Sequence, residues 1–259
     1  MTFQKLVSQC HEIISTYPNA QIGIAIIDGV QSFYHQEKAV FRAASTIKIP
    51  ILLASYLYLY SKIDDIAVIH DRLIVEGAGV IPFLTGKLPF TYRNLMELMI
   101  IVSDNTASNA LLYANTMEKV NQLMKYIGCE ESKIERYFMD ENAVLKGLDN
   151  STTAKDMILM LQQIGESNSI LNDEQRKDAR RILGNQQFED MLPAYTFDEE
   201  IHYYHKTGGL TGVDHDVAII EYQDKKLYVA VLTQGWEDGF TGKKCIAEIG
   251  KVIADYLKS

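Results

Sequence analysis

The sequence predicts an α+β fold, in which helices flank a five-stranded antiparallel sheet and an all-helical lobe is inserted into that sheet. Runs of β-branched and aromatic residues occur near both ends of the chain, whereas the long middle shows helical periodicity. Strands and helices segregated in this way are typical of α+β proteins. We expect a single two-lobed domain over residues 1–259, with residues 1–40 and 196–259 forming the sheet lobe and residues 41–195 the helical lobe.

The N-terminal segment predicts a helix followed by a hairpin. Apolar positions at helical spacing alternate with polar ones over residues 1–18. Two β-rich runs follow, residues 21–29 and 30–36, and the Asp28-Gly29 pair between them favours a hairpin turn. The first segment lacks the continuous apolar core of a signal peptide. The chain as given is therefore predicted to be cytoplasmic, or secreted if a leader was removed.

The middle of the chain predicts helices almost throughout, from residue 45 to about residue 195. Residues 49–60 are apolar on every side, so we expect a helix buried in the centre of the protein, too short to cross a bilayer. Further helices are expected where the periodicity is clear, over residues 92–103, 104–116, 116–128, 152–166 and 173–185.

The C-terminal part returns to strands. Three β-rich runs, residues 202–210, 213–222 and 226–235, are separated by turn residues and followed by a helix over residues 243–257. Together with the two N-terminal strands, these runs would complete one antiparallel sheet whose halves come from opposite ends of the chain.

Composition excludes several classes of function. The net charge of −9 argues against nucleic-acid binding, and no cationic patch suggests a membrane surface. The three cysteines lie far apart without metal-ligand spacing. His202 and His205 would point to opposite faces of a strand, which argues against a shared metal ion. We therefore expect no metal, no cofactor, no nucleic-acid or membrane partner, and a monomer.

Ser45 and Lys48 stand at the entrance to the apolar run. On a helix, residues three apart share a face, so the lysine amine would lie within reach of the serine hydroxyl. Partial burial favours the neutral amine, which can then act as a base toward the serine. The alternative interpretation is that Ser45 caps the helix and Lys48 occupies its first turn.

Two more short motifs share this ambiguity when each is taken alone. Ser103-Asp104-Asn105 suits a helix N-terminus, and Lys206-Thr207-Gly208-Gly209 suits the end of a strand. In this order, however, S-x-x-K, S-D-N and K-T-G form the signature of class A β-lactamases and penicillin-binding proteins. The surrounding blocks ASTIKIPILL, IIVSDNTASNALL and HKTGGLTG also resemble that superfamily, and the expected layout of strands and helices is similar to its two-lobed fold.

The resemblance implies a catalytic role for four residues. Ser45 would be the nucleophile that attacks the acyl carbon, and Lys48 would accept its proton directly or through water. Ser103 would pass a proton to the leaving nitrogen. Lys206 would orient the carboxylate of the substrate.

The resemblance also implies a set of substrate-binding residues. Asn105 would hold both Lys48 and the side-chain amide of the substrate, and Thr207 would bind the substrate carboxylate beside Lys206. Gly208 would let the substrate approach the strand. The oxyanion would lie between the backbone N–H groups of Ser45 and Gly209.

One expected element is missing. Class A enzymes carry a Glu, followed by Asn four residues later, which positions the water that cleaves the acyl-enzyme. Here Glu135 is followed by Met139 and Glu141 by Leu145. Glu141, or Asp140 beside it, is the candidate deacylation base, and the alternative is a surface acidic pair.

These observations lead to a functional hypothesis with two alternatives. The leading one is a class A-type serine β-lactamase with an acyl-enzyme on Ser45 and weak deacylation, acting on a small-molecule β-lactam or acyl-peptide. A D-alanyl-D-alanine carboxypeptidase-like enzyme, or another amide or ester hydrolase, would use the same residues. The third is a sensor that binds β-lactams without turnover. His215 and Asp216 follow the K-T-G motif and are expected either at the rim of the site or as ordinary strand residues.

Overall fold

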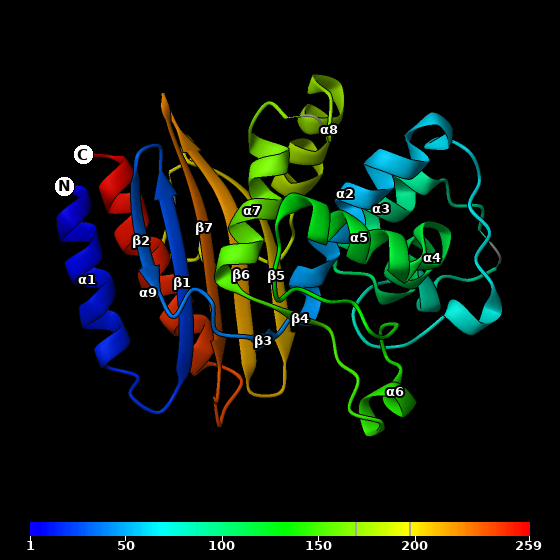
Figure 1. The fold of residues 1–259 in the computed structure, drawn as a ribbon, viewed down its shortest axis with the longest axis horizontal. Helices are drawn as coiled ribbons and strands as arrows, with labels where there is room; N and C mark the ends of the chain where they lie inside the picture. Colours follow the sequence, from blue (N-terminus) through cyan, green and yellow to red (C-terminus); the bar gives the residue numbers. More distant parts are fainter. Residues whose placement is uncertain (87, 169, 197) are drawn as a thin grey trace.

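A five-stranded antiparallel sheet divides the molecule into two layers of helices (Figure 1). The computed structural model describes residues 1–86, 88–168, 170–196 and 198–259. The strand order is β2-β1-β7-β6-β5, where the strands are β1 (Gln21–Asp28), β2 (Gln31–His35), β5 (His202–Leu210), β6 (Val213–Tyr222) and β7 (Lys225–Gln234). The predicted α+β fold is confirmed, including the pairing of strands from opposite ends of the chain.

Register shows how the two ends are joined. β1 pairs with β2 through the expected hairpin and with β7 along its whole length, from Gln21 opposite Gln234 to Asp28 opposite Leu227. β5 is an edge strand, and its pairing with β6 places Gly208 opposite His215. The K-T-G segment therefore lies at an edge of the sheet, where its backbone is accessible to other elements.

Helices α1 (Phe3–Ser15) and α9 (Thr241–Leu257) lie against one face of the sheet, on the left in Figure 1. Their buried apolar side chains, among them Leu6, Cys10 and Ile249, form one core with that face. The other face packs against a second core built largely from helices. Both faces are covered, which explains why β6 and β7 are buried along most of their length.

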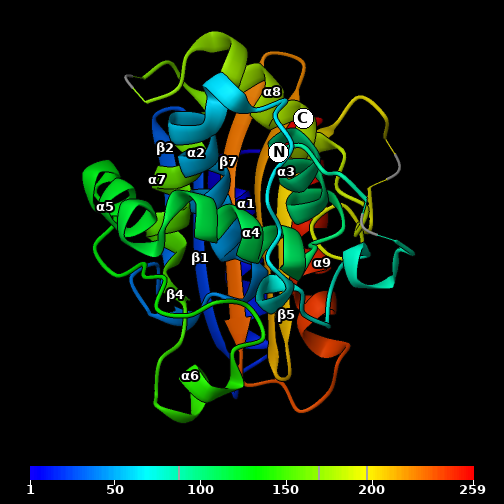
Figure 2. The ribbon, with the colours of Figure 1, turned by 90° about the vertical axis from the view of Figure 1, so that its right-hand side faces the viewer.

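The central helix of the second layer is α2 (Lys48–Leu59), which is buried along almost its whole length as predicted. Around it lie α3 (Tyr92–Ile101), α4 (Asn105–Asn115), α5 (Met117–Ile127), α7 (Ala154–Gly165) and α8 (Asp173–Gly184). Viewed from the helical side, α4 lies in front of the sheet, and the short helix α6 (Glu141–Leu145) projects at the lower end (Figure 2).

The expectation of helices almost throughout residues 45–195 is wrong in two places. Between α2 and α3, the described residues form only the 3-10 turns Tyr60–Lys62, Asp71–Leu73 and Ile81–Phe83. Gly77 and Gly79 have positive φ there, which an α-helix cannot accommodate. Between α5 and α7, the chain forms a loop that contains α6 and the strand β4 (Ser151–Thr152).

A second, two-stranded sheet was not foreseen from the sequence. β3 (Phe41–Arg42) pairs with β4, so the segment before Ser45 is joined to the end of the loop before α7. In the parts of the chain that the structure describes, no helix is long and apolar enough to cross a membrane. The lobe boundaries at residues 40 and 195 stay a prediction.

Candidate active site

The three sequence motifs meet where the helical layer contacts the edge of the sheet. Ser45 lies in the 3-10 turn Ala44–Ile47 that leads directly into α2, and Lys48 is the first residue of α2. Ser103 and Asn105 come from the junction of α3 and α4, and Lys206 comes from β5. Residues distant in sequence are therefore brought to one place by the packing of α2, α4 and β5.

Lys48 is the centre of this cluster. Its side chain is fully buried, and Nζ lies 2.7 Å from the Ser103 carbonyl oxygen, 2.9 Å from Ser103 Oγ and 3.0 Å from Asn105 Oδ1. All the side-chain hydrogen bonds of Lys48 to described residues go to these two partners. None of these hydrogen bonds goes to the Ser45 hydroxyl.

The Ser103 hydroxyl lies between two lysines. Lys206 Nζ is 3.2 Å from Ser103 Oγ and 2.7 Å from the Thr207 carbonyl oxygen. A hydroxyl oxygen has two lone pairs and one proton. Once Lys48 and Lys206 are both protonated, each ammonium can donate to one lone pair of Ser103 Oγ, and the Ser103 proton is then free to point toward a substrate nitrogen.

Both lysines are fully buried, and this changes their acid–base properties. Burial lowers the pKa of Lys206 to about 7, although the carboxylate of Asp216 opposes the shift. Burial also lowers the pKa of Lys48 well below its usual value, and the positive charge of Lys206 acts in the same direction. The lowered pKa favours the neutral amine of Lys48, whose free electron pair can accept a proton.

Backbone strain occurs at two points of the cluster. Ser103 has φ of 56° and Ala44, directly before Ser45, has φ of 46°. Left-handed backbone is uncommon for residues other than glycine and costs free energy, so surrounding contacts must hold it. One of these strained residues is Ser103 itself, and the other, Ala44, directly precedes Ser45.

Helix capping explains Asp104 but not Ser45. No side chain caps the 3-10 turn or α2, so Ser45 is not a helix cap. Asp104, in contrast, caps α4 by accepting from Ala107 N, and its other carboxylate oxygen accepts from the backbone of Val80 and Ile81. In the S-D-N motif, the aspartate therefore stabilises the local structure while the serine and asparagine face Lys48.

Gly208 is required by close packing. A Cβ atom built at this position would lie 3.1 Å from the backbone nitrogens of both Ser45 and Thr46. Any larger residue would push β5 and the Ser45 turn apart, because contacts this short force the neighbour to move. Thr207, beside it, is nearly buried.

A cavity of about 340 Å³ opens beside this cluster. Among its lining residues are the predicted Ser45, Asn105, Gly209 and Glu141, together with apolar side chains such as Phe138 and Val144. Glu141 is exposed at the start of α6, and none of the hydrogen bonds of the described residues joins it to Lys48 or Ser45. Asp140 caps α6 through Ala143 N at 3.0 Å. A role for either in deacylation stays a prediction.

Phe138 is a site residue that the sequence analysis missed. Lys48 Nζ lies 4.6 Å from the centre of its ring. Asn109 holds the Phe138 backbone on both sides, accepting from its N–H at 2.8 Å and donating to its carbonyl at 3.2 Å. The loop before α6 thus places an aromatic ring, not a carboxylate, over the amine. Only the tertiary packing of this loop on α4 identifies the residue.

The same loop is anchored at its far end. Arg136 and Arg42 both form ion pairs with Asp149, at 2.7 and 2.8 Å. Asn150 Oδ1 accepts from the backbone of Glu135 and Arg136. These contacts tie the wall of the cavity to β3 and therefore to the segment that carries Ser45.

The histidines singled out in the sequence do not form a metal site. His202 and His205 lie on β5 as expected, and within the described ranges no group of three or more His, Cys, Asp or Glu side chains is suited to hold a metal ion. His215 and Asp216 are fully buried, so neither lies at the rim of the site.

The family of the chain follows from its sequence and fold together. The model of the β-lactamase enzyme family matches residues 5–257, and the chain belongs to that family. Membership indicates a hydrolase with a small-molecule substrate. No curated protein matches the sequence significantly.

Several solved structures share the fold. The β-lactamase from Sphaerobacter thermophilus DSM 20745 is 28% identical, with a TM-score of 0.90 over 100% of this chain and 98% of that one. PBP-A is 24% identical, with a TM-score of 0.87 over 99% of this chain and 97% of that one, and a mutant of it was solved as an acyl-enzyme complex with penicillin G. A variant of the last common ancestor of class A β-lactamases from Gram-negative bacteria is 22% identical, with a TM-score of 0.85 over 97% of each chain.

Proposed function

We propose that this protein is an active-site-serine hydrolase of β-lactams or related acyl-amides, working through an acyl-enzyme on Ser45. The observation that carries the proposal is the cluster in which buried Lys48 and Lys206 both contact the Ser103 hydroxyl, beside a cavity lined by Ser45. A hydroxyl nucleophile, a buried amine of lowered pKa and a shared proton donor are the parts that serine acylation without histidine needs.

The proposed acylation step moves one proton along this cluster. Neutral Lys48 takes the proton of Ser45, directly or through a water, as Ser45 Oγ bonds to the acyl carbon. The negative oxygen that forms is held by the backbone N–H groups of Ser45 and Gly209. As the carbon–nitrogen bond breaks, Ser103 gives its proton to the leaving nitrogen and regains one from Lys48, 2.9 Å away.

The binding roles follow from charge and position. Protonated Lys206, with Thr207, attracts the substrate carboxylate. Asn105 accepts from Lys48 through Oδ1, and its Nδ2 donates to the Glu76 carbonyl oxygen at 3.4 Å. The residue lines the cavity in which the side-chain amide of a substrate would lie. We propose no metal and no cofactor for any step.

A second candidate, slow release of the acyl group, is favoured by Phe138. Its ring covers Lys48 on the cavity side, and an aromatic ring cannot activate a water. The protein would then acylate readily and deacylate slowly, as a penicillin-binding sensor or a peptidase-like enzyme does. A mutant of PBP-A, which has this fold, was solved as an acyl-enzyme complex with penicillin G.

One experiment separates these outcomes. A chromogenic cephalosporin is added at several-fold molar excess, and product formation and the intact mass of the protein are followed together, with Ser45→Ala as control. Sustained turnover that Ser45→Ala abolishes establishes the hydrolase. A burst of about one equivalent with a lasting adduct establishes slow deacylation. If the wild type gives neither product nor adduct, the proposal is wrong.

A further inference from the structure

His215 is a fully buried imidazole that the proposed mechanism does not use. It lies on β6 directly opposite Gly208, the residue that packs against the Ser45 turn. Nε2 is 2.8 Å from the Arg42 carbonyl oxygen, and Nδ1 is 3.0 Å from the backbone nitrogen of Thr233.

The neighbours of the ring determine its tautomer. The Thr233 N–H can only donate, so Nδ1 must accept. Burial lowers the pKa of His215 to about 4, so the ring is neutral at pH 7 and its proton is on Nε2. Nε2–H therefore donates to Arg42. The opposite tautomer would bond Nδ1–H to the Asp214 carbonyl 2.7 Å away, but it would lose both other hydrogen bonds.

Arg42 connects this contact to the nucleophile. It ends β3, and only Ala43 and the strained Ala44 separate it from Ser45. The backbone of this segment is held on one side by the bond from Ala43 N to the Asn150 carbonyl at 2.8 Å. On the other side, His215 is the one side chain of the five-stranded sheet that bonds to the backbone of residues 41–47, among the residues that the structure describes.

His215 also lies close to β5, the strand that carries Gly208 and Gly209. Because Gly208 is its cross-strand partner, the imidazole lies beneath the point where β5 meets the Ser45 turn. The ring of Phe41 packs edge-on against His215, with ring centres 5.9 Å apart, and limits sideways movement. One rigid side chain thus links the segment that leads to Ser45 with the strands that lead to Gly209.

We propose that His215 is a positioning residue for acylation, which sets the separation of the Ser45 and Gly209 backbone N–H groups by holding the Arg42 carbonyl. The inference rests on the proposed function, in which these two groups bind the oxyanion. Losing one such donor typically lowers the rate about 100- to 1000-fold, so partial misplacement should cost about 10-fold or more.

Two variants of His215 form a matched pair. In His215→Gln, the side-chain amide reaches the place of Nε2 and can still donate to Arg42. In His215→Asn, the shorter amide reaches the place of Nδ1, keeps the partner Thr233 and loses Arg42. We expect the acylation rate constant for penicillin G, followed by intact mass, to fall at least 10-fold in His215→Asn and less than about 3-fold in His215→Gln. The dissociation constant of the non-covalent complex should stay within about 3-fold in both.

Amide hydrogen exchange over residues 41–47 tests the same link without any substrate. Exchange should be faster in His215→Asn than in the wild type or His215→Gln. Unchanged exchange and acylation in His215→Asn would overturn the inference, as would equal losses in both variants that follow their melting temperatures. If exchange is faster in His215→Asn than in the wild type but the wild type forms no adduct, the proposed function alone would be contradicted.

Discussion

Lys206 makes substrate binding depend on pH. Its pKa of about 7 means that the ammonium is present below neutral pH and is lost as the pH rises. We expect the affinity for a β-lactam carboxylate to fall at least several-fold between pH 6 and pH 9. The measurement is the concentration dependence of acylation at each pH. A methyl ester of the same β-lactam serves as control, and an equal fall for the ester would contradict the assignment of Lys206.

Phe138 decides the fate of the acyl-enzyme in our proposal. Replacing it by Glu places a carboxylate near Lys48 and the cavity, where it can orient a water. We expect Phe138→Glu to raise the deacylation rate about 10-fold or more, measured as the decay of the mass adduct. Phe138→Leu, which removes the ring without adding a base, should change the rate much less. Equal deacylation rates in both variants would show that a carboxylate at this position does not act as the deacylation base.

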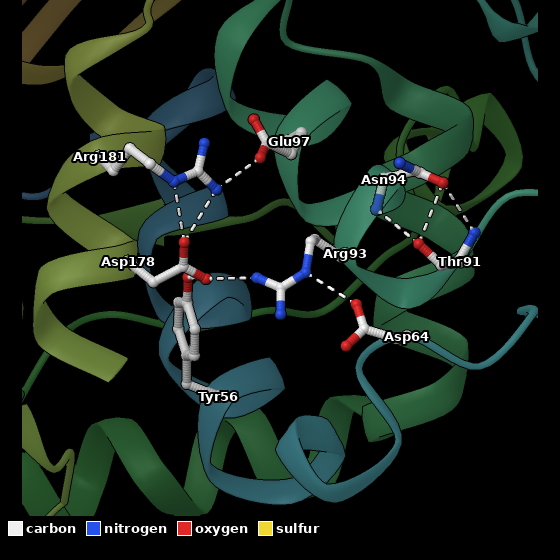
Figure 3. Close-up of polar contacts among 8 residues, drawn as sticks. All are labelled: Tyr56, Asp64, Thr91, Arg93, Asn94, Glu97, Asp178 and Arg181. Atoms are coloured by element: carbon white, nitrogen blue, oxygen red, sulfur yellow. Dashed lines mark hydrogen bonds and ion pairs between the residues drawn. The ribbon is translucent and has the colours of Figure 1, made fainter. Parts of the chain in front are cut away.

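At the scale of elements, a polar network joins α2, α3 and α8 (Figure 3). Asp178 on α8 accepts from Tyr56 on α2 and Arg93 on α3, each at 2.8 Å, and from Arg181. Arg181 also pairs with Glu97 on α3. The carboxylate is mostly buried, so its loss would leave donors on all three helices without their acceptor.

This network predicts a measurable contribution to stability. Asp178→Ala should lower the free energy of unfolding by about 2 kcal/mol, since it removes several charge-assisted hydrogen bonds at once. Asp64→Ala is the matched control, because Asp64 pairs with the same Arg93 but is largely exposed, and it should lower the free energy of unfolding much less. Urea unfolding of both variants gives the comparison. A smaller loss in Asp178→Ala than in Asp64→Ala would contradict the role of the network.

At the scale of the whole molecule, His215 links stability to pH. Its pKa is near 4 in the folded protein, against about 6.5 when unfolded. The unfolded chain therefore binds the proton more readily, so the neutral buried ring stabilises the fold above pH 6.5 and this contribution is lost as the pH falls through 4.

The size of this loss of stability follows from the pKa shift of His215. Between pH 7 and pH 4, the wild type should lose about 3 kcal/mol more unfolding free energy than His215→Gln, which has no titrating ring. Comparing the two proteins isolates this residue from the many carboxylates that titrate in the same range. If the unfolding free energies of the two proteins changed with pH in parallel, the pKa of His215 would not be lowered as predicted.

Much of the fold was predictable from local sequence patterns. Period-two and helical patterns, turn residues and the all-round apolar character of residues 49–60 specify β1, β7 and α2 within a few residues. The loop between α2 and α3 was not predictable in this way, because its conformation depends on Gly77 and Gly79 packing against the S-D-N segment. Local propensity is a weak guide wherever tertiary contacts define the backbone.

For the candidate site, the sequence by itself determined which functional groups are present and their order along the chain, since the three motifs are short and contiguous. Only the tertiary structure decided what surrounds them. It placed Phe138 over Lys48, made the Ser103 hydroxyl the common partner of two lysines, and buried His215 beneath the Ser45 turn. The physical reason is that burial and hydrogen-bond partners arise from elements far apart in sequence, and these contacts control pKa values and backbone positions.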